Sequence, residues 1–152
     1  LISGSADKTI RFWNLATGKE IRTIKDHNSF INFLAIAPDG QTLVSASADK
    51  TIKLWNLATG KQIRTLKGHS GYVNYLAITP DGQTLASASS DKTIKLWNLS
   101  NGQAIRTLTG HSNSVNSLAI APDGKTLFSA GADKNIKIWD LTTKTEIRTL
   151  TG

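Results

Sequence analysis

The sequence predicts an all-β protein built from repeats of one small antiparallel sheet. The first reason is a twelve-residue stretch that occurs four times. Its aspartates and its tryptophans are each spaced by 42 residues: Asp7, Asp49, Asp91 and Asp133, with Trp13, Trp55, Trp97 and Trp139. A fixed period of this size is typical of repeat architectures. Each repeat also contains short apolar runs bounded by turn residues, which indicate strands. Finally, no segment keeps a helical period over even about ten residues.

The third repeat, residues 69–110, shows the predicted elements in order. Residues 72–79 form an apolar run rich in β-forming side chains, which predicts a strand. The Pro-Asp-Gly sequence that ends at Gly82 predicts a turn, because proline presets φ and glycine accepts a positive φ. Three more strands are expected, with short turns between them, over residues 83–89, 93–98 and 103–108. The repeat is therefore expected to be a four-stranded meander.

The predicted strands are apolar on both of their faces. In the run 72–79, strict alternation would place Val73, Tyr75 and Ala77 on one face and Leu76 and Ile78 on the other. A sheet needs apolar residues on both faces when both faces are covered. Small sheets that are covered on both sides by copies of themselves predict radial stacking, which is a β-propeller.

The repeated motifs also carry a family resemblance. A Gly-His pair precedes each later tryptophan by about 28 residues, Pro-Asp-Gly lies between them, and Ser-x-x-x-Asp leads to Trp-Asn or Trp-Asp. This pattern is similar to that of the WD-repeat β-propeller family. Two departures are the Trp-Asp dipeptide, present only at Trp139-Asp140, and the first Gly-His, which reads Asp26-His27.

The resemblance implies about three and a half four-stranded antiparallel blades in the chain. We expect a partial blade that lacks its innermost strand, followed by three full blades, with boundaries at residues 1–24, 25–66, 67–108 and 109–152. Leu1 falls within a repeat and no initiator methionine precedes it, so the chain is expected to be a piece of a longer protein.

Each repeat combines a histidine, a serine, an aspartate and a tryptophan at constant spacing. A Ser-His-Asp set suggests a hydrolase triad, but three identical copies favour a structural role, and we predict no catalytic residue and no enzymatic activity. The resemblance implies a hydrogen-bonded tetrad in each full blade: His27, Ser45, Asp49 and Trp55; His69, Ser87, Asp91 and Trp97; His111, Ser129, Asp133 and Trp139. The first blade would keep a partial tetrad of Ser3, Asp7 and Trp13.

No metal site or cofactor is predicted. The histidines of successive blades would stand about 10 Å apart, whereas zinc needs each ligand at about 2.0–2.1 Å. The Pro-Asp-Gly turns lack the spaced aspartates of a calcium loop. Ala58-Thr-Gly-Lys61 lacks the upstream glycine and the helix of a phosphate-binding loop.

The candidates for partner binding lie near the start of each inner strand, where the repeats differ at Phe30, Tyr72 and Ser114, and at Ser90 before the repeated aspartate. The resemblance places them on the top face of the propeller, near its central opening: Phe30, Asn32, Tyr72, Asn74, Ser90, Ser114 and Asn116. Exposed aromatic side chains among polar groups are suitable anchors for a partner. Equally, Phe30 and Tyr72 could simply cover the ends of the sheets.

The predicted function is a non-catalytic scaffold that binds a protein or peptide through this top face. The alternative is a regulatory propeller module of a larger enzyme, such as a kinase or a nucleotidase, whose catalytic domain lies outside the chain. The net charge of +7 suggests an acidic partner, but basic residues recur once per repeat, which favours a solvated rim over nucleic-acid binding. No apolar run reaches the roughly 20 residues of a membrane span. The chain has no cysteine, in keeping with a cytoplasmic location.

The repeat count also predicts an assembly. Terminal blades need neighbours, and an open row would expose Ile10 and Phe12 at one end and Ile136 and Ile138 at the other. Two chains arranged head to tail would cover both faces. We therefore predict a homodimer that forms a ring of about eight blades, two of them incomplete, if no other part of the polypeptide completes the ring.

Overall fold

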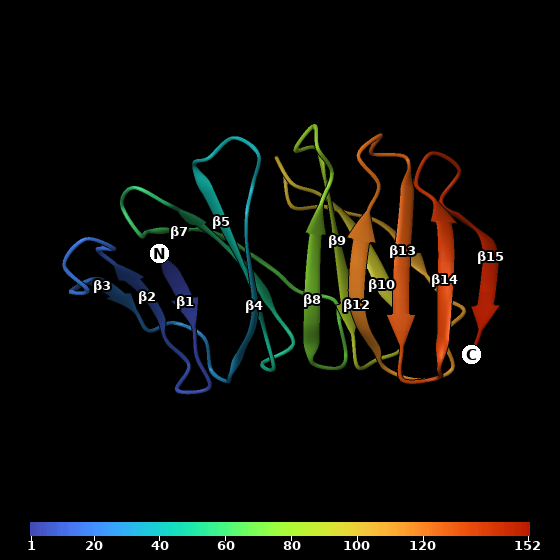
Figure 1. The fold of residues 1–152 in the computed structure, drawn as a ribbon, viewed down its shortest axis with the longest axis horizontal. Coiled ribbons are helices and arrows are strands. Elements are labelled where there is room, and N and C mark those ends of the chain that lie inside the picture. Colours follow the sequence, from blue (N-terminus) through green and yellow to red (C-terminus); the bar gives the residue numbers. More distant parts are fainter.

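The computed structural model describes residues 1–152 as fifteen strands arranged in four antiparallel sheets. No helix is present, and so none that could cross a membrane. The sheets follow one another in chain order, and the two chain ends lie at opposite ends of the row, so the row does not close into a ring (Figure 1). This architecture confirms an all-β protein made of four-stranded propeller blades, the first of which has three strands.

Each sheet is a simple meander, named here as a blade. Blade 1 consists of β1 (Ile2–Gly4), β2 (Ile10–Trp13) and β3 (Glu20–Ile24). Blade 2 consists of β4 (Ile31–Ile36), β5 (Thr42–Ser47), β6 (Ile52–Asn56) and β7 (Gln62–Leu66). Blade 3 consists of β8 (Val73–Ile78), β9 (Thr84–Ser89), β10 (Ile94–Asn98) and β11 (Ala104–Leu108). Blade 4 consists of β12 (Val115–Ile120), β13 (Thr126–Gly131), β14 (Asn135–Asp140) and β15 (Thr145–Thr151).

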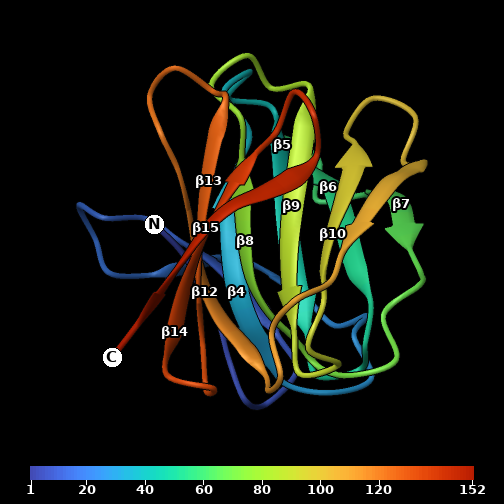
Figure 2. The same cartoon turned by 90° about the vertical axis from the view of Figure 1, so that its right-hand side faces the viewer.

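The apolar core lies between successive blades. One cluster joins Val44, Ile52 and Leu66 of blade 2 to Val73 and Trp97 of blade 3, among others. Equivalent clusters join blade 1 to blade 2 and blade 3 to blade 4. The innermost strands β4, β8 and β12 lie side by side, so the blades stack radially (Figures 1 and 2). Both faces of blades 2 and 3 are covered, which explains why their strands are apolar on both parities.

The strict alternation predicted for the inner strand is wrong at Val73. This residue packs with Leu76 against blade 2, whereas Tyr75 and Ala77 pack toward blade 4. The cause is a β-bulge: Val73 pairs with Ser89 while Tyr75 pairs with the adjacent Ala88, so Asn74 is an extra residue in the strand. A bulge shifts the side-chain alternation by one residue. The same irregularity occurs in β4 and β12.

The predicted exposed face at the N-terminal end is also wrong. Ile10 is only 1 % exposed and Phe12 is partly buried, because both point toward blade 2 and pack against its Ile31, Leu43 and Trp55. The outer face instead carries Leu1 and Leu15, which are 67 % and 78 % exposed.

At the other end of the row the prediction agrees with the structure for Ile136. This residue is 44 % exposed, and Phe128 and Leu150 are exposed to a similar degree. Ile138 is partly buried. The equivalent residue of blade 3, Ile94, is wholly buried against blade 4. The last blade therefore presents to solvent a face that is covered in blades 2 and 3.

The turn that precedes the tryptophan-bearing strand of every blade holds a lysine in the left-handed region of φ. The values are 71° for Lys8, 72° for both Lys50 and Lys92, and 65° for Lys134. Residues with a Cβ atom rarely adopt this conformation, because it costs about 1–2 kcal/mol. Each turn therefore carries local strain directly after the repeated aspartate.

Candidate functional site

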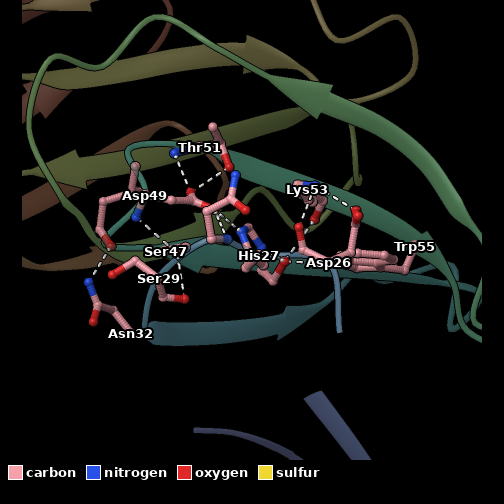
Figure 3. Close-up of polar contacts among 12 residues, drawn as sticks. Asp26, His27, Ser29, Asn32, Ser47, Asp49, Thr51, Lys53 and Trp55 are labelled. Carbon is pink, nitrogen blue, oxygen red and sulfur yellow. Dashed lines mark hydrogen bonds and ion pairs between the residues drawn. The ribbon is translucent and has the colours of Figure 1, made fainter. Parts of the chain in front are cut away.

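The His, Ser, Asp and Trp residues of blade 2 form one continuous hydrogen-bonded network. His27 Nδ1 lies 2.7 Å from Asp49 Oδ2, and His27 Nε2 lies 2.7 Å from Ser45 Oγ. Trp55 Nε1 donates to the same Ser45 oxygen at 2.9 Å. The histidine comes from the loop between β3 and β4, the aspartate from the β5–β6 turn, and the tryptophan from β6 (Figure 3). The network therefore ties the incoming loop to the sheet.

Blades 3 and 4 repeat this network with nearly the same distances. In blade 3 the His69–Asp91 and His69–Ser87 distances are both 2.8 Å, and Trp97 donates to Ser87 at 2.9 Å. The third copy gives 2.8 Å for each of its three bonds and joins the remaining predicted residues: His111, Ser129, Asp133 and Trp139. The structure thus brings together all three sets of four residues.

The donor and acceptor inventory assigns a direction to each chain of bonds. The indole of Trp97 can only donate and the carboxylate of Asp91 can only accept. The hydroxyl of Ser87 therefore accepts from the indole and donates to His69 Nε2, while His69 Nδ1 donates to the carboxylate. A neutral imidazole satisfies every member of this chain, so none of the buried polar groups is left without a partner.

The protonation states agree with this assignment. Burial of the ring lowers the pKa of His27 and of His69 below 6.5, even though the neighbouring aspartates act in the opposite direction. Burial raises the pKa of Asp49, but hydrogen bonds from Thr51 and His27 outweigh it and bring that pKa to about 2. The same balance gives a pKa of about 2 for Asp91. Near neutral pH the network therefore pairs an aspartate anion with a neutral histidine.

Burial decides between the two interpretations of the Ser-His-Asp set. Ser45 and Ser87 are 0 % exposed, and each hydroxyl lies between an indole and an imidazole. A nucleophile must be reachable by the substrate carbonyl and must lie beside an oxyanion hole. No substrate can reach these hydroxyls in the folded chain, which favours a structural role for the tetrads, as hydrogen-bonded links between the connecting loop and the sheet.

The partial tetrad of blade 1 keeps only one of these bonds. Trp13 Nε1 donates to Ser3 Oγ at 2.8 Å. Asp7, with no histidine opposite, instead accepts from Arg11 at 2.6 Å and stays exposed. The chain contains no group of three or more His, Cys, Asp and Glu side chains that could hold a metal ion.

The predicted partner-binding residues of blade 3 gather where its inner strand begins. The Ser90 N–H donates to the carbonyl of Tyr72 at 2.9 Å, and the Ser90 hydroxyl lies 3.3 Å from the amide of Asn74. Asn74 Nδ2 also donates to the carbonyl of Val115, in blade 4, at 2.9 Å. Tyr72 itself is 55 % exposed. Blade 3 thus presents one aromatic side chain on a backbone that is fixed by hydrogen bonds.

The other predicted positions follow the same geometry. Phe30 is 53 % exposed, and its carbonyl accepts from the N–H of Ala48 at 2.9 Å. Asn32 Nδ2 donates to the Val73 carbonyl of blade 3 at 3.0 Å. In blade 4, Ser114 bonds the turn through its carbonyl in the same way, and Asn116 is exposed. The asparagines of blades 2 and 3 therefore bridge adjacent inner strands, a role that no pattern in the sequence indicates.

Comparison with known proteins finds the repeat throughout the chain. The family model described as "WD domain, G-beta repeat" matches residues 1–14, 18–56, 60–98 and 102–140. A Lissencephaly-1 homolog of Caenorhabditis briggsae is 43 % identical over 44 residues, which are 29 % of this chain and 11 % of that protein. The DDB1- and CUL4-associated factor 13 of Dictyostelium discoideum is 43 % identical over 42 residues, 28 % of the chain and 9 % of that protein.

A third relative is the Small ribosomal subunit protein RACK1y of Oryza sativa subsp. japonica, 38 % identical over 40 residues, which are 26 % of the chain and 12 % of that protein. Each match thus spans roughly one repeat of the chain and about a tenth of the length of the relative. The family model, in contrast, covers most of the 152 residues at the period that the tetrads show. With its four repeats and its bladed fold, the chain belongs to the WD domain, G-beta repeat family.

Proposed function

We propose that the chain is a non-catalytic scaffold that binds a protein or peptide through its top face, the end of the blades that carries Phe30, Tyr72 and Ser90. The observation that supports this most is the pair of exposed aromatic side chains, Phe30 and Tyr72, held on a hydrogen-bonded backbone. Rigid aromatic anchors contribute strongly to protein interfaces because they bury large areas at a small entropic cost. Two of the relatives are named for assembly with other molecules, one as a ribosomal subunit protein and one as a DDB1- and CUL4-associated factor.

Nucleic acid is a weaker candidate for the partner. Lys53 and Lys137 form ion pairs with Asp26 and Glu146, so part of the positive charge is neutralised within the chain. Nucleic-acid binding through phosphates would fall steeply with added salt, whereas binding through aromatic anchors would change little.

A peptide selection tests the proposed face. Twelve-residue peptides selected on the immobilised chain are compared for binding to the parent and to Tyr72→Ala, and we expect about a tenfold loss in the variant with an almost unchanged melting temperature. Ile63→Ala is the matched control, because Ile63 is similarly exposed, at 51 %, but lies on the outer strand β7. Equal binding by the parent and Tyr72→Ala would refute the proposed face. A large loss of stability in Tyr72→Ala would show that the ring serves the core.

For the 152-residue chain by itself we also propose the head-to-tail homodimer. Phe128, Ile136 and Leu150 at one end occupy positions that are buried between the other blades. Leu1 and Leu15 at the opposite end match Leu43 and Leu57, which cover such a face in blade 2. The two exposed ends therefore carry the two opposite sides of the apolar interface that joins neighbouring blades.

Light scattering on a chromatographed sample tests this assembly. We expect a mass of twice 16.4 kDa at micromolar concentration for the parent chain. Ile136→Asp should give the mass of one chain without unfolding it, because a charge on a covered apolar face is costly. A parent mass near 16.4 kDa would exclude the dimer.

A further inference from the structure

A basic side chain recurs on the tryptophan-bearing strand of every blade, beside the full or partial tetrad. These residues are Arg11, Lys53, Lys95 and Lys137, each two positions before the tryptophan. In three of the blades this cation is paired with a carboxylate of the chain itself. Blade 3 is different, because Lys95 Nζ donates only to the hydroxyl of Thr107, at 2.8 Å, and forms no ion pair.

The other blades show how a carboxylate binds at this position. In blade 2, Lys53 Nζ lies 2.5 Å from Asp26 Oδ2 and also donates to the Asp26 carbonyl at 3.1 Å. In blade 4, Lys137 Nζ contacts both oxygens of Glu146, at 3.0 and 2.9 Å, and also Thr149 Oγ1 at 2.6 Å. The carboxylate thus comes from the incoming loop in one blade and from the outer strand in the other.

Blade 3 has neither source of a carboxylate. Gly68 stands at the position of Asp26 and Ala104 at the position of Glu146. The surroundings are otherwise conserved between blades 3 and 4. The three atoms nearest to a Cβ atom added to Gly110 of blade 4 belong to Glu146, Trp139 and Lys137, whereas the three nearest to one added to Gly68 belong to Trp97 and Lys95. The lysine, tryptophan and glycine that surround the Glu146 carboxylate are therefore all present in blade 3, without the carboxylate.

We propose that Lys95 and Thr107, in the space left free by the absent side chain of Gly68, form a binding site for one carboxylate side chain of a partner polypeptide, which takes the place that Glu146 fills in blade 4. The ammonium has three N–H donors and Thr107 uses one, so two are left for a ligand. Charge-assisted bonds of this kind are shorter and stronger than neutral ones. Lys67, which is exposed, precedes Gly68 and adds positive charge to the approach. A glutamate- or aspartate-containing peptide fits this site better than a nucleic acid, because the groups that fill it elsewhere in the chain are carboxylates and it offers one built cation rather than a row of phosphate contacts.

The proposal deepens the proposed scaffold function, on which it rests, by naming the chemistry of one side chain of the partner. Its test is the binding of fluorescein-labelled hexaglutamate, followed by fluorescence anisotropy, which does not require the natural partner. Lys95→Gln removes the cation. Ala104→Glu supplies an internal carboxylate, as blade 4 does, and keeps the lysine. Gln62→Glu is the matched control, because it introduces a glutamate at the equivalent position of blade 2, where Lys53 is already paired with Asp26.

All three variants change the net charge by the same amount, so a non-specific attraction of the basic chain would be weakened equally in each. We expect hexaglutamate to bind about tenfold more weakly to both Lys95→Gln and Ala104→Glu, and within about twofold of the parent for Gln62→Glu. Circular dichroism melts check that each variant is folded. Ala104 is exposed, so Ala104→Glu keeps the test available even if Lys95→Gln unfolds.

Three results would overturn the proposal: equal losses in all three variants, unchanged binding by Ala104→Glu, or hexaglutamine binding as tightly as hexaglutamate. A single-stranded oligonucleotide of equal charge that binds more tightly than the peptide, and loses that binding in Lys95→Gln, would assign the site to phosphate and also overturn it. Tyr72→Ala separates this inference from the proposed function. If Tyr72→Ala weakens the selected peptides while Ala104→Glu leaves hexaglutamate binding unchanged, only the carboxylate site is refuted.

Discussion

His69 and Asp91 are joined by a 2.8 Å bond between Nδ1 and Oδ2, although the histidine lies on the loop that leaves β7 of blade 2 and the aspartate lies on a turn of blade 3. The same carboxylate accepts the N–H of Ser70 at 3.0 Å. One aspartate therefore holds both the side chain and the backbone of the connecting loop.

Removal of this carboxylate should destabilise the fold. Asp91→Ala leaves His69 Nδ1 and the Ser70 N–H without their acceptor, and we expect a loss of about 1–3 kcal/mol in the free energy of unfolding. Asp7→Ala is the control, because Asp7 occupies the same repeat position but is exposed and has no histidine partner. Urea titrations give both values. If the two variants are equally stable, the network does not hold the loop.

Acidification should weaken the fold in two stages. The folded chain holds His27 and His69 at pKa values below 6.5, so the unfolded chain takes up these protons first and stability falls as the pH drops below 6.5. The pKa values of Asp49, Asp91 and Asp133 are lowered from 3.8 to about 2, so the stability they contribute is complete above pH 3.8 and is lost as the pH falls through 2.

Unfolding titrations at a series of pH values measure this dependence. In Asp91→Asn the loss of stability between pH 3.8 and 2 should be smaller than in the parent, because one of the three carboxylates whose pKa is lowered to about 2 is gone. A parent chain that becomes more stable on acidification over either range would contradict the assigned protonation states.

The inter-blade core should be sensitive to truncation. Ile94 is wholly buried between blades 3 and 4, so Ile94→Ala is expected to cost about 2–5 kcal/mol. Ile63 is 51 % exposed on the outer strand, and Ile63→Ala should change stability by no more than about 0.5 kcal/mol. Thermal melts of the two variants compare them directly, and similar shifts would mean that blade packing does not carry the stability.

Relief of the strained turn should stabilise the chain. Lys92 has a φ of 72°, which costs about 1–2 kcal/mol for a residue with a Cβ atom, whereas glycine adopts it freely at an entropic cost of about 0.5–1 kcal/mol. Lys92→Gly is therefore expected to gain about 0.5–1 kcal/mol. Lys61→Gly, at a position without positive φ, should instead lower the melting temperature. A lower melting temperature for Lys92→Gly would show that the turn is not strained.

The sequence predicts the blades well because their signals are local and repeated. The predicted strand over residues 72–79 is β8, Val73–Ile78, and the other predicted strands of that repeat agree to within about one residue at each end. The tetrad residues could be selected for the same reason, since their donors and acceptors match at a constant spacing.

The features that the sequence did not reveal depend on single-residue shifts and on neighbours. A bulge at Asn74 inserts one residue into β8, and no compositional pattern marks it, so strict alternation assigns Val73 to the wrong face. The sequence also does not reveal that Ile10 faces blade 2, because alternation shows that two faces exist but not which of them meets the next blade. The ion pairs of Lys53 and Lys137 use acids from different elements, so no fixed spacing reveals them.

Each tetrad fastens a loop that belongs, along the chain, to the junction of two blades. If the chain were pulled at Leu1 and Gly152, tension would reach blade 3 through the segment between Leu66 and Val73, in which His69 is hydrogen-bonded to Ser87 and Asp91. The network would have to break before that segment could lengthen. Under load the blades should therefore unfold one at a time, each only after the hydrogen bonds of its own tetrad have broken. Each tetrad would thus delay the unfolding of the blade into which its loop leads.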